Sequence, residues 1–229
     1  CTASDVAHFA MRFPFEFTEG QKKAVDDVYA NLKAPTRMNR LLQGDVGSGK
    51  TAVALCALYM AVKSGYQGAF LAPTEVLAAQ NFALLQKYFP EYRVAFLAGS
   101  TPAREKTAVK KGLASGEIDI VCGTHAVLQA DEQPKNLALC VCDEQHRFGV
   151  AQRSALGEKG AGADMLVMSA TPIPRTLSLI FYGDLDISEI KDKPKARSEI
   201  VTGIVPPRKY DDMLEYIGEQ AKLGNQSYF

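Results

Sequence analysis

The sequence predicts an α/β fold in which a mostly parallel sheet carries helices on both faces. From residue 40 onward, short apolar runs alternate with longer stretches of helical periodicity. The short runs are apolar on both faces, which is typical of buried parallel strands. The chain has 229 residues, 47% of them hydrophobic, so one large domain, or one and a half, can bury a sizeable core.

The expected strands and helices follow one another along the chain. Strands are expected at residues 40–43, 68–72, 93–97, 118–122, 137–142 and 165–168. Helices are expected between them, at about residues 50–63, 75–89, 102–115 and 173–181. Thr74 and Thr101 carry the hydroxyl groups that favour helix N-caps, and Pro102 suits a first helical position.

The composition changes after this region. Residues 191–197 (KDKPKAR) are polar and contain one proline, which predicts a linker. A strand at 200–205 and a helix to about residue 223 then predict the start of a second lobe, and we interpret the chain as a fragment. The expected segments are an N-terminal linker or helix end at 1–14, the main lobe at 15–190, and a linker with a truncated second lobe at 191–229.

Charge and hydropathy exclude several classes of protein. The 26 basic and 26 acidic residues balance, which argues against a protein that passively coats a polyanion. The longest apolar run, Ala52–Val62, is far shorter than the roughly 18 to 20 residues that cross a bilayer. Residues 1–17 lack the apolar stretch of a signal peptide, so we expect a cytoplasmic protein. One expected helix carries a basic cluster of Arg104, Lys106, Lys110 and Lys111. Such a cluster is more typical of a solvated helix face than of a nucleic-acid-binding patch.

The five cysteines are odd in number and form no C-x-x-C pair. Three of them lie in expected strands, so we predict that they are buried small hydrophobic residues. A zinc site would need His8, His125 or His146, and no zinc-finger or knuckle spacing occurs in the sequence.

Residues 44–51, GDVGSGKT, fit the phosphate-loop pattern G-x-x-x-x-G-K-[ST] between an apolar strand and an apolar helix. The glycines let backbone N–H groups turn inward, and the following helix presents its positive N-terminus. Lys50 is expected to reach the β- and γ-phosphates of a nucleotide, and Thr51 to offer its hydroxyl to Mg²⁺. The predicted nucleotide-binding residues of this loop are Gly44, Gly47, Ser48, Gly49, Lys50 and Thr51.

An apolar strand that ends in acidic residues completes such a site. Residues 137–146, LALCVCDEQH, provide one, and Asp143 is expected to hold Mg²⁺. Glu144 is placed to polarise the attacking water as a general base, and His146 to contact the γ-phosphate. An Asp-Glu pair alone is as often a solvated strand end, so this inference depends on its combination with the phosphate loop.

Five short motifs occur in a characteristic order. They are GDVGSGKT (44–51), APTEVLAAQ (72–80), GTHAVLQ (123–129), DEQH (143–146) and SATPIPRTL (169–177). The last follows an apolar strand, so the hydroxyls of Ser169 and Thr171 would emerge at the carboxyl edge of the sheet, where ligands of open α/β sheets bind. In this order they resemble motifs I, Ia, Ib, II and III of superfamily 2 helicases. Their residues closely resemble the corresponding motifs of the RecG-type ATP-dependent DNA helicases of bacteria.

The resemblance covers about residues 13–229. It implies a RecA-like P-loop NTPase lobe that uses ATP and Mg²⁺. The intact enzyme would bind forked or branched DNA as a monomer, and would remodel stalled forks and Holliday junctions in recombination and repair. The wedge domain and second helicase lobe of such an enzyme are not in this chain. Because the arginine finger lies in that second lobe, the fragment alone should hardly hydrolyse ATP.

The resemblance also implies roles for single residues. Phe17 and Gln21 would contact the adenine, the glutamine through one amide donor and one acceptor. Arg147, Ser169 and Thr171 would couple hydrolysis to DNA movement. The residues expected to grip the nucleic-acid backbone are Pro73, Thr74, Glu75, Gly99, Gly123, Thr124 and His125. The alternatives are that Gln21 is an ordinary surface residue, and that the residues expected to grip the nucleic-acid backbone are ordinary helix caps.

Alternative functions remain open from the sequence. A transcription-repair coupling factor would share most motifs, but it usually has glutamine at the position of His146. A kinase needs an acceptor pocket with lid arginines and a GTPase needs N-K-x-D, and neither pattern occurs. A module that senses ATP without turnover is the non-enzymatic alternative. Glu144 argues against it, because sensing needs no general base.

Overall fold

The computed structural model describes residues 1–124, 127, 134–143, 162–170, 185–192 and 202–227. The chain divides into two compact units, unit 1 (Cys1–Pro194) and unit 2 (Lys195–Phe229). The helix expected at 173–181 lies outside the described residues.

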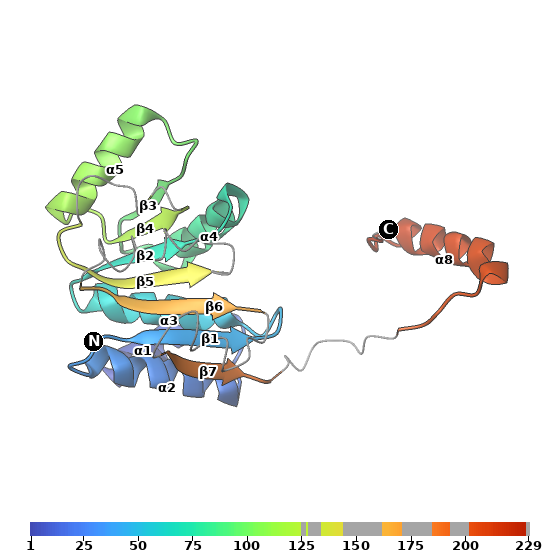
Figure 1. Cartoon of the computed structure of the whole chain (residues 1–229), viewed down its shortest axis with the longest axis horizontal. Helices are drawn as coiled ribbons and strands as arrows, with labels where there is room; N and C mark the ends of the chain where they lie inside the picture. Colours follow the sequence, from blue (N-terminus) through green and yellow to red (C-terminus); the bar gives the residue numbers. More distant parts are fainter. Residues whose placement is uncertain (125–126, 128–133, 144–161, 171–184, 193–201, 228–229) are drawn as a thin grey trace. The chain divides into compact units, whose positions relative to one another are not determined.

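Unit 1 is built on a seven-stranded sheet with the strand order β3-β4-β2-β5-β6-β1-β7 (Figure 1). Each pair of neighbouring strands is parallel. The strands are β1 (Asn39–Gly44), β2 (Gln67–Leu71), β3 (Val94–Leu97), β4 (Ile120–Gly123), β5 (Leu137–Asp143), β6 (Asp164–Ser169) and β7 (Asp186–Ile190). The predicted parallel α/β fold is confirmed. Because all strands point the same way, their carboxyl ends lie along one edge of the sheet.

The helices described in unit 1 cover both faces of the sheet. They are α1 (Ala3–Ala10), α2 (Glu19–Lys33), α3 (Lys50–Lys63), α4 (Glu75–Tyr88) and α5 (Ala103–Ser115). Buried residues of α1 to α4 join a large apolar cluster, whereas Leu113 of α5 joins a smaller one. Along β5, Val141 belongs to the large cluster and its neighbours Cys140 and Cys142 to the small one. Successive side chains of a strand point to opposite faces, so the two clusters lie on opposite sides of the sheet.

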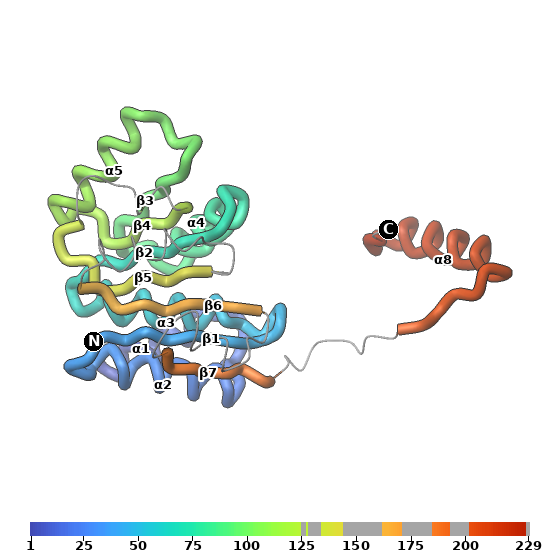
Figure 2. Tube along the Cα trace, in the orientation of Figure 1, coloured from blue at the N-terminus to red at the C-terminus, as the bar shows by residue number. Residues whose placement is uncertain are grey.

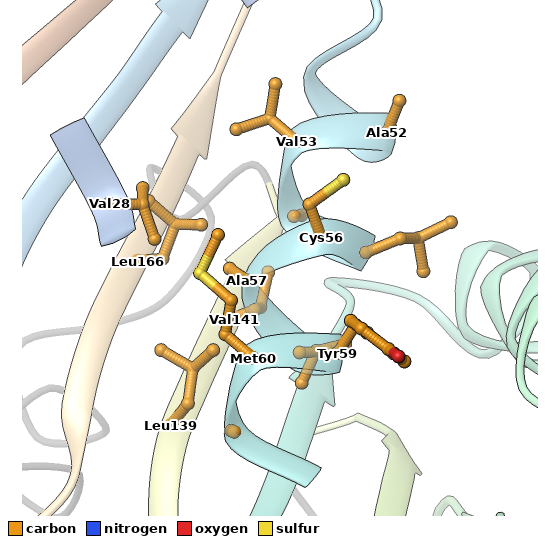
Figure 3. Packing of buried hydrophobic residues seen from close by; sticks show 14 of the residues in the cluster. Val28, Ala52, Val53, Cys56, Ala57, Tyr59, Met60, Leu139, Val141 and Leu166 are labelled. Carbon is orange, nitrogen blue, oxygen red and sulfur yellow. The ribbon is translucent and has the colours of Figure 1, made fainter. Parts of the chain in front are cut away.

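Helix α3 lies within the large cluster. All residues of Ala52–Val62 are buried. Figure 3 shows side chains of this helix, among them Cys56 and Met60, beside Val141 of β5 and Leu166 of β6. The longest apolar run of the sequence is therefore a helix that is apolar all round because it is enclosed on all sides. Within the described residues, no helix is long and apolar enough to cross a membrane.

Residues 1–14 pack on the same core. Phe9 is fully buried, and its ring stacks on that of Tyr59 with centroids 4.3 Å apart. Arg12 makes two hydrogen bonds to the carboxylate of Glu91, at 3.0 and 2.6 Å. These contacts tie α1 and the turn after it to α3 and to the end of α4.

Several elements of unit 1 differ from the sequence expectations, among them α2, where no helix was expected. The edge strand β7 pairs with β1 although the two are far apart in the sequence (Figure 2). It was not expected because its sequence, DISEI, alternates between exposed and buried positions instead of forming an apolar run. Helix α5 begins one residue later than predicted, with Pro102 as its N-cap. Thr101 does not cap it, because its hydroxyl accepts a hydrogen bond from the Ala98 N–H at 3.0 Å.

The cysteines of the core are buried as predicted, namely Cys56, Cys122, Cys140 and Cys142. Burial raises the pKa of Cys140 to about 12, so its thiol stays protonated at neutral pH. These residues act as small apolar side chains of the core.

Unit 2 contains a 3₁₀ turn, η3 (Pro207–Lys209), and the helix α8 (Tyr210–Lys222). The helix ends close to the predicted residue. The prediction of a strand at 200–205 is wrong for residues 202–205, which have no regular structure. The described part of this unit contains no other strand with which such a segment could pair, and an unpaired strand leaves its backbone hydrogen bonds to water.

Candidate nucleotide and nucleic-acid site

The carboxyl edge of the sheet brings together residues from distant motifs. Gly44 ends β1, Asp143 ends β5 and Ser169 ends β6. Strand β6 lies between β1 and β5, with Ser169 beside Gln43 and Met168 beside Asp143. The phosphate loop, the expected Mg²⁺ ligand and Ser169 therefore lie at three adjacent strand ends, as ligand sites of parallel sheets do.

The phosphate loop joins β1 to α3 through glycines with special backbone geometry. Gly47 and Gly49 have φ values of +78° and +82°, in the left-handed region that favours glycine. A Cβ atom on Gly49 would clash with the side-chain amide of Gln21. A Cβ atom on Gly44 would collide with the hydroxyl of Ser48. The three glycines of the predicted loop are thus explained by close approach or by backbone conformation.

Lys50 and Ser48 present polar groups inside the loop. Lys50 Nζ donates hydrogen bonds to the carbonyl oxygens of Gly44 at 2.6 Å and Asp45 at 3.0 Å. Ser48 Oγ is buried and has no hydrogen-bond partner among the described residues. A buried polar group without a partner costs about 1 to 3 kcal/mol, a cost that a hydrogen-bonding ligand would remove. An ammonium, a hydroxyl and inward-turned N–H groups are the chemistry that fits phosphate oxygens.

Gln21 connects the start of α2 to the phosphate loop. Its side chain is only 3% exposed. Its Oε1 accepts a hydrogen bond from Thr18 N at 2.9 Å, and its Nε2 donates one to Ser48 O at 2.8 Å. The amide expected to recognise adenine is therefore engaged within the chain, and an adenine would use the second N–H and the second acceptor site that such an amide carries. That contact stays a prediction.

Phe17, the other residue expected near the adenine, is partly buried against the large core cluster. Its ring meets that of Phe13 edge-on, with centroids 5.3 Å apart. Both rings line an apolar groove of about 840 Å³ between α1, the following turn and α2. A flat base could stack in such an aromatic environment, and this contact also stays a prediction.

The loops expected to contact nucleic acid are linked to each other. Thr74 caps α4 as predicted, with its hydroxyl accepting from Leu77 N at 3.3 Å. Glu75 accepts hydrogen bonds from the Ser100 N–H at 3.0 Å and from the Ser100 hydroxyl at 2.6 Å. These bonds hold the pKa of Glu75 below its usual range. The loop after β2 and the loop after β3 are thus joined by one carboxylate.

Gly99, Gly123 and Thr124 lie at the same edge. Lys106 Nζ donates to Gly99 O at 2.7 Å, which holds the loop after β3 from its other side. A Cβ atom on Gly123 would overlap the carbonyl of Leu97, so only glycine permits this approach of the two strand ends. Thr124 is 4% exposed, and its N–H donates to Leu97 O at 3.2 Å. Their contacts with DNA stay predictions.

Several predicted site residues lie outside the described residues: His125, Glu144, His146, Arg147 and Thr171. Their chemical roles stay predictions based on the sequence.

Two contacts beside the site were missed by sequence analysis. Thr18 forms a capping box with Gln21, for which the T-x-x-Q spacing was an available signal. Asp192 accepts a hydrogen bond from the Gly20 N–H at 2.6 Å. No local pattern could predict that bond, because the two residues are far apart in the sequence.

Comparison with known sequences gives consistent matches over almost the whole chain. ATP-dependent DNA helicase RecG of Staphylococcus aureus (strain NCTC 8325 / PS 47) is 46% identical over 224 residues, which is 97% of this chain and 33% of that protein. RecG of Thermotoga maritima is 45% identical over 222 residues, covering 96% of this chain and 28% of that protein. The chain thus spans about a third of the length of these relatives.

Comparison with solved structures agrees with these sequence matches. A structure of RecG bound to a three-way DNA junction matches with a TM-score of 0.85 and 41% identity, over 98% of this chain and 30% of that one. The DEAD-box helicase Mss116, bound to single-stranded RNA, matches with a TM-score of 0.67 and 21% identity over 95% of this chain and 50% of that one, which supports the fold alone. The sequence profile of the DEAD/DEAH box helicase family matches residues 18–180. The resemblance to RecG-type helicases is confirmed, and the chain belongs to the DEAD/DEAH box helicase family.

Proposed function

We propose that this chain is the ATP-binding lobe of an ATP-dependent DNA helicase that remodels branched DNA, such as stalled forks and Holliday junctions, in the bacterial cytoplasm. One observation carries the proposal. A phosphate loop lies at the carboxyl edge of a sheet that also presents Asp143. Lys50 faces into this loop, and the buried Ser48 hydroxyl has no hydrogen-bond partner in the described part of the chain. A relative with the same fold and 41% identity has been solved on a three-way DNA junction.

The nucleotide would be held mainly through its phosphates. Lys50 Nζ would exchange its two carbonyl partners for β- and γ-phosphate oxygens, and the Ser48 hydroxyl would gain a partner. The Thr51 hydroxyl in the first turn of α3 and the Asp143 carboxylate at the end of β5 would hold Mg²⁺. A bound Mg²⁺ neutralises developing charge on the phosphates. Glu144 would act as the general base on the attacking water.

The DNA would be held at the other half of the same edge. The N-terminus of α4 and the loop at Gly99 and Ser100 lie together because Glu75 and Lys106 fix that loop from two sides. Backbone N–H groups and hydroxyls at such positions suit phosphates, and carry no sequence information. Binding through the backbone fits an enzyme that selects the shape of a junction rather than its sequence. Strand separation and the arginine finger would be supplied by the wedge domain and second lobe of the intact enzyme.

The nucleotide site is tested with the 229-residue chain. Lys50→Ala should abolish binding of ATP and ADP in calorimetry, because the phosphates lose the side-chain cation of the loop. Lys63→Ala is a matched control, since Lys63 ends the same helix α3 at the side away from the loop and is 44% exposed. Equal ATP affinity of Lys50→Ala and the parent would reject the proposed site.

The action on DNA is tested with the intact enzyme. Its ATPase rate should rise more with a three-way junction than with a linear duplex of the same length and composition. Equal stimulation by both substrates would contradict a helicase specialised for branched DNA.

A further inference from the structure

Two segments that are far apart in the sequence hold the phosphate loop from the outside. One is the start of α2, through Gln21 and Ser48. The other is the end of β7, where Ile190 is paired with Gly44, the first residue of the loop. A Cβ atom on Gly44 would lie 3.1 Å from Ile190 O and 3.3 Å from Ile190 Cβ, so the two backbones are in close contact. The position of the loop therefore depends on both segments.

Strand β7 is fixed to the sheet and to α2 by a polar network. Arg40, in β1, is 8% exposed and donates from Nη1 to Ser188 Oγ at 2.7 Å. Ser188 Oγ in turn donates to Asp27 Oδ2, in α2, at 2.7 Å. Arg40 Nη2 also reaches Asp186 Oδ2 at 3.2 Å. The network holds the middle of β7, but it does not reach the start of α2 that carries Gln21.

Asp192 closes the remaining gap between β7 and the start of α2. Its Oδ2 accepts a hydrogen bond of 2.6 Å from the N–H of Gly20, one of the donors that a helix start leaves without an internal partner. A Cβ atom on Gly20 would lie 2.7 Å from that same oxygen, so the absence of a side chain permits the bond. The contacts then form a closed ring, from the phosphate loop through Gln21, Gly20, Asp192 and Ile190 back to Gly44.

We propose that Asp192 is a positioning residue of the nucleotide site. By holding the Gly20 N–H, it fixes the first turn of α2 so that the Gln21 amide stays at the phosphate loop, where the base of the nucleotide is selected. The inference rests on the proposed function, because it takes the phosphate loop as the nucleotide site and Gln21 as the residue that contacts adenine. Asp192, two residues before the end of unit 1, thereby takes part in base selection.

A purely local role as a helix cap is the competing explanation. Helix α2 already has a local cap, since Thr18 Oγ1 accepts from Gln21 N at 3.3 Å and Gln21 Oε1 from Thr18 N. A second cap would add to the stability of α2, but it would not change which base is preferred. Base preference therefore separates the two roles, whereas the melting temperature does not.

The experiment measures dissociation constants for ADP, GDP and inorganic pyrophosphate on the 229-residue chain by calorimetry. Asp192→Ala should lower the ratio of the GDP to the ADP constant by about two- to tenfold, the range expected for loss of one hydrogen bond. Pyrophosphate binding should stay unchanged. Glu189→Gln is the matched control, because it removes the same charge near the same strand end, where the Glu189 carboxylate pairs at 3.2 Å with the exposed Lys191.

A double-mutant cycle tests the partner. Gly20→Ala should lower the ratio of the GDP to the ADP constant, because the new Cβ displaces the Asp192 carboxylate. The double variant, Gly20→Ala with Asp192→Ala, should lower this ratio no further than either single variant does. Additive effects would overturn the proposal, and so would an unchanged GDP to ADP ratio in Asp192→Ala.

Two further readouts keep the outcomes distinct. If Lys50→Ala and the parent bind ADP equally, the proposed function fails, and the Asp192 proposal fails with it. If Lys50 behaves as expected but Asp192→Ala matches Glu189→Gln, only the positioning role fails. Amide hydrogen exchange at Gly20 should accelerate in Asp192→Ala with no nucleotide present, and unchanged exchange there would also overturn the proposal.

Discussion

The Arg40 network offers a stability prediction whose size can be worked out from the structure. Arg40→Met keeps an apolar stem in the core and removes the guanidinium. Arg40 is 8% exposed, and its guanidinium donates to Asn31 Oδ1 and Ser188 Oγ, each at 2.7 Å. Its ion pairs are weaker, because Asp27 is 3.7 Å away and Asp186 is 60% exposed.

The expected loss follows from these contacts. Two short hydrogen bonds to partly buried acceptors contribute about 1 kcal/mol each, and the pair with the exposed Asp186 adds little. We therefore expect Arg40→Met to lower the free energy of unfolding by about 2 kcal/mol. For a chain of this size, that corresponds to a fall in Tm of about 4 to 8 °C.

The assay is thermal and urea denaturation followed by circular dichroism, with Arg93→Met as the matched control. Arg93 also pairs with a carboxylate, that of Glu117 at 2.9 Å, but both side chains are about two-thirds exposed, at 68% and 64%. Its loss should change the stability by less than about 0.5 kcal/mol. Equal destabilisation by both variants would refute the reasoning, because it would mean that burial does not set the strength of these contacts.

Three further outcomes are expected. In the intact enzyme, Glu144→Gln should keep ATP binding while kcat falls by about 10² to 10⁴-fold through loss of the general base; an unchanged kcat in a steady-state ATPase assay contradicts this role. Gln21→Ala should weaken ADP binding more than GDP binding in calorimetry, and an unchanged ratio would leave Gln21 only as a helix cap. Hydrogen bonds from Ser100 lower the pKa of Glu75 in the folded chain. The stability that they contribute is therefore present above the pKa of Glu75 in the unfolded chain, and it is lost as the pH falls through the lower pKa of the folded chain. The NMR shift of the Ser100 amide should titrate with a midpoint below that of glutamate in a peptide, and a midpoint at or above it would show that this bond does not persist in solution.

The sequence predicted best where one physical pattern dominated. The unbroken apolar runs around Leu41, Phe70 and Val141 predicted central strands because such strands are buried on both faces. The phosphate loop was predictable because its glycines are needed for backbone geometry that no other residue adopts easily. Their placement at one edge followed from the parallel arrangement alone.

Other features could not be predicted because they depend on contacts between distant residues. Strand β7 has exposed positions, since it lies at the edge of the sheet and pairs on one side only. The bond from Gly20 to Asp192 has no local pattern. The internal bonding of the Gln21 amide depends on where the phosphate loop passes α2, which the sequence does not state. Helix α1 is a different case, because the capping box of Thr2 and Asp5 was a signal that could have been used.

The position of β1 in the sheet has a consequence for synthesis of the protein. Strand β1 lies between β6 and β7, which are translated long after it. At about 5 to 20 residues per second, the ribosome needs roughly 7 to 30 s to pass from the phosphate loop to the end of β7. For most of that interval, until β6 is made, β1 is an apolar segment without either neighbour, and such segments are prone to aggregate. A nascent chain therefore carries the complete loop sequence well before the strands on either side of β1 have both been made.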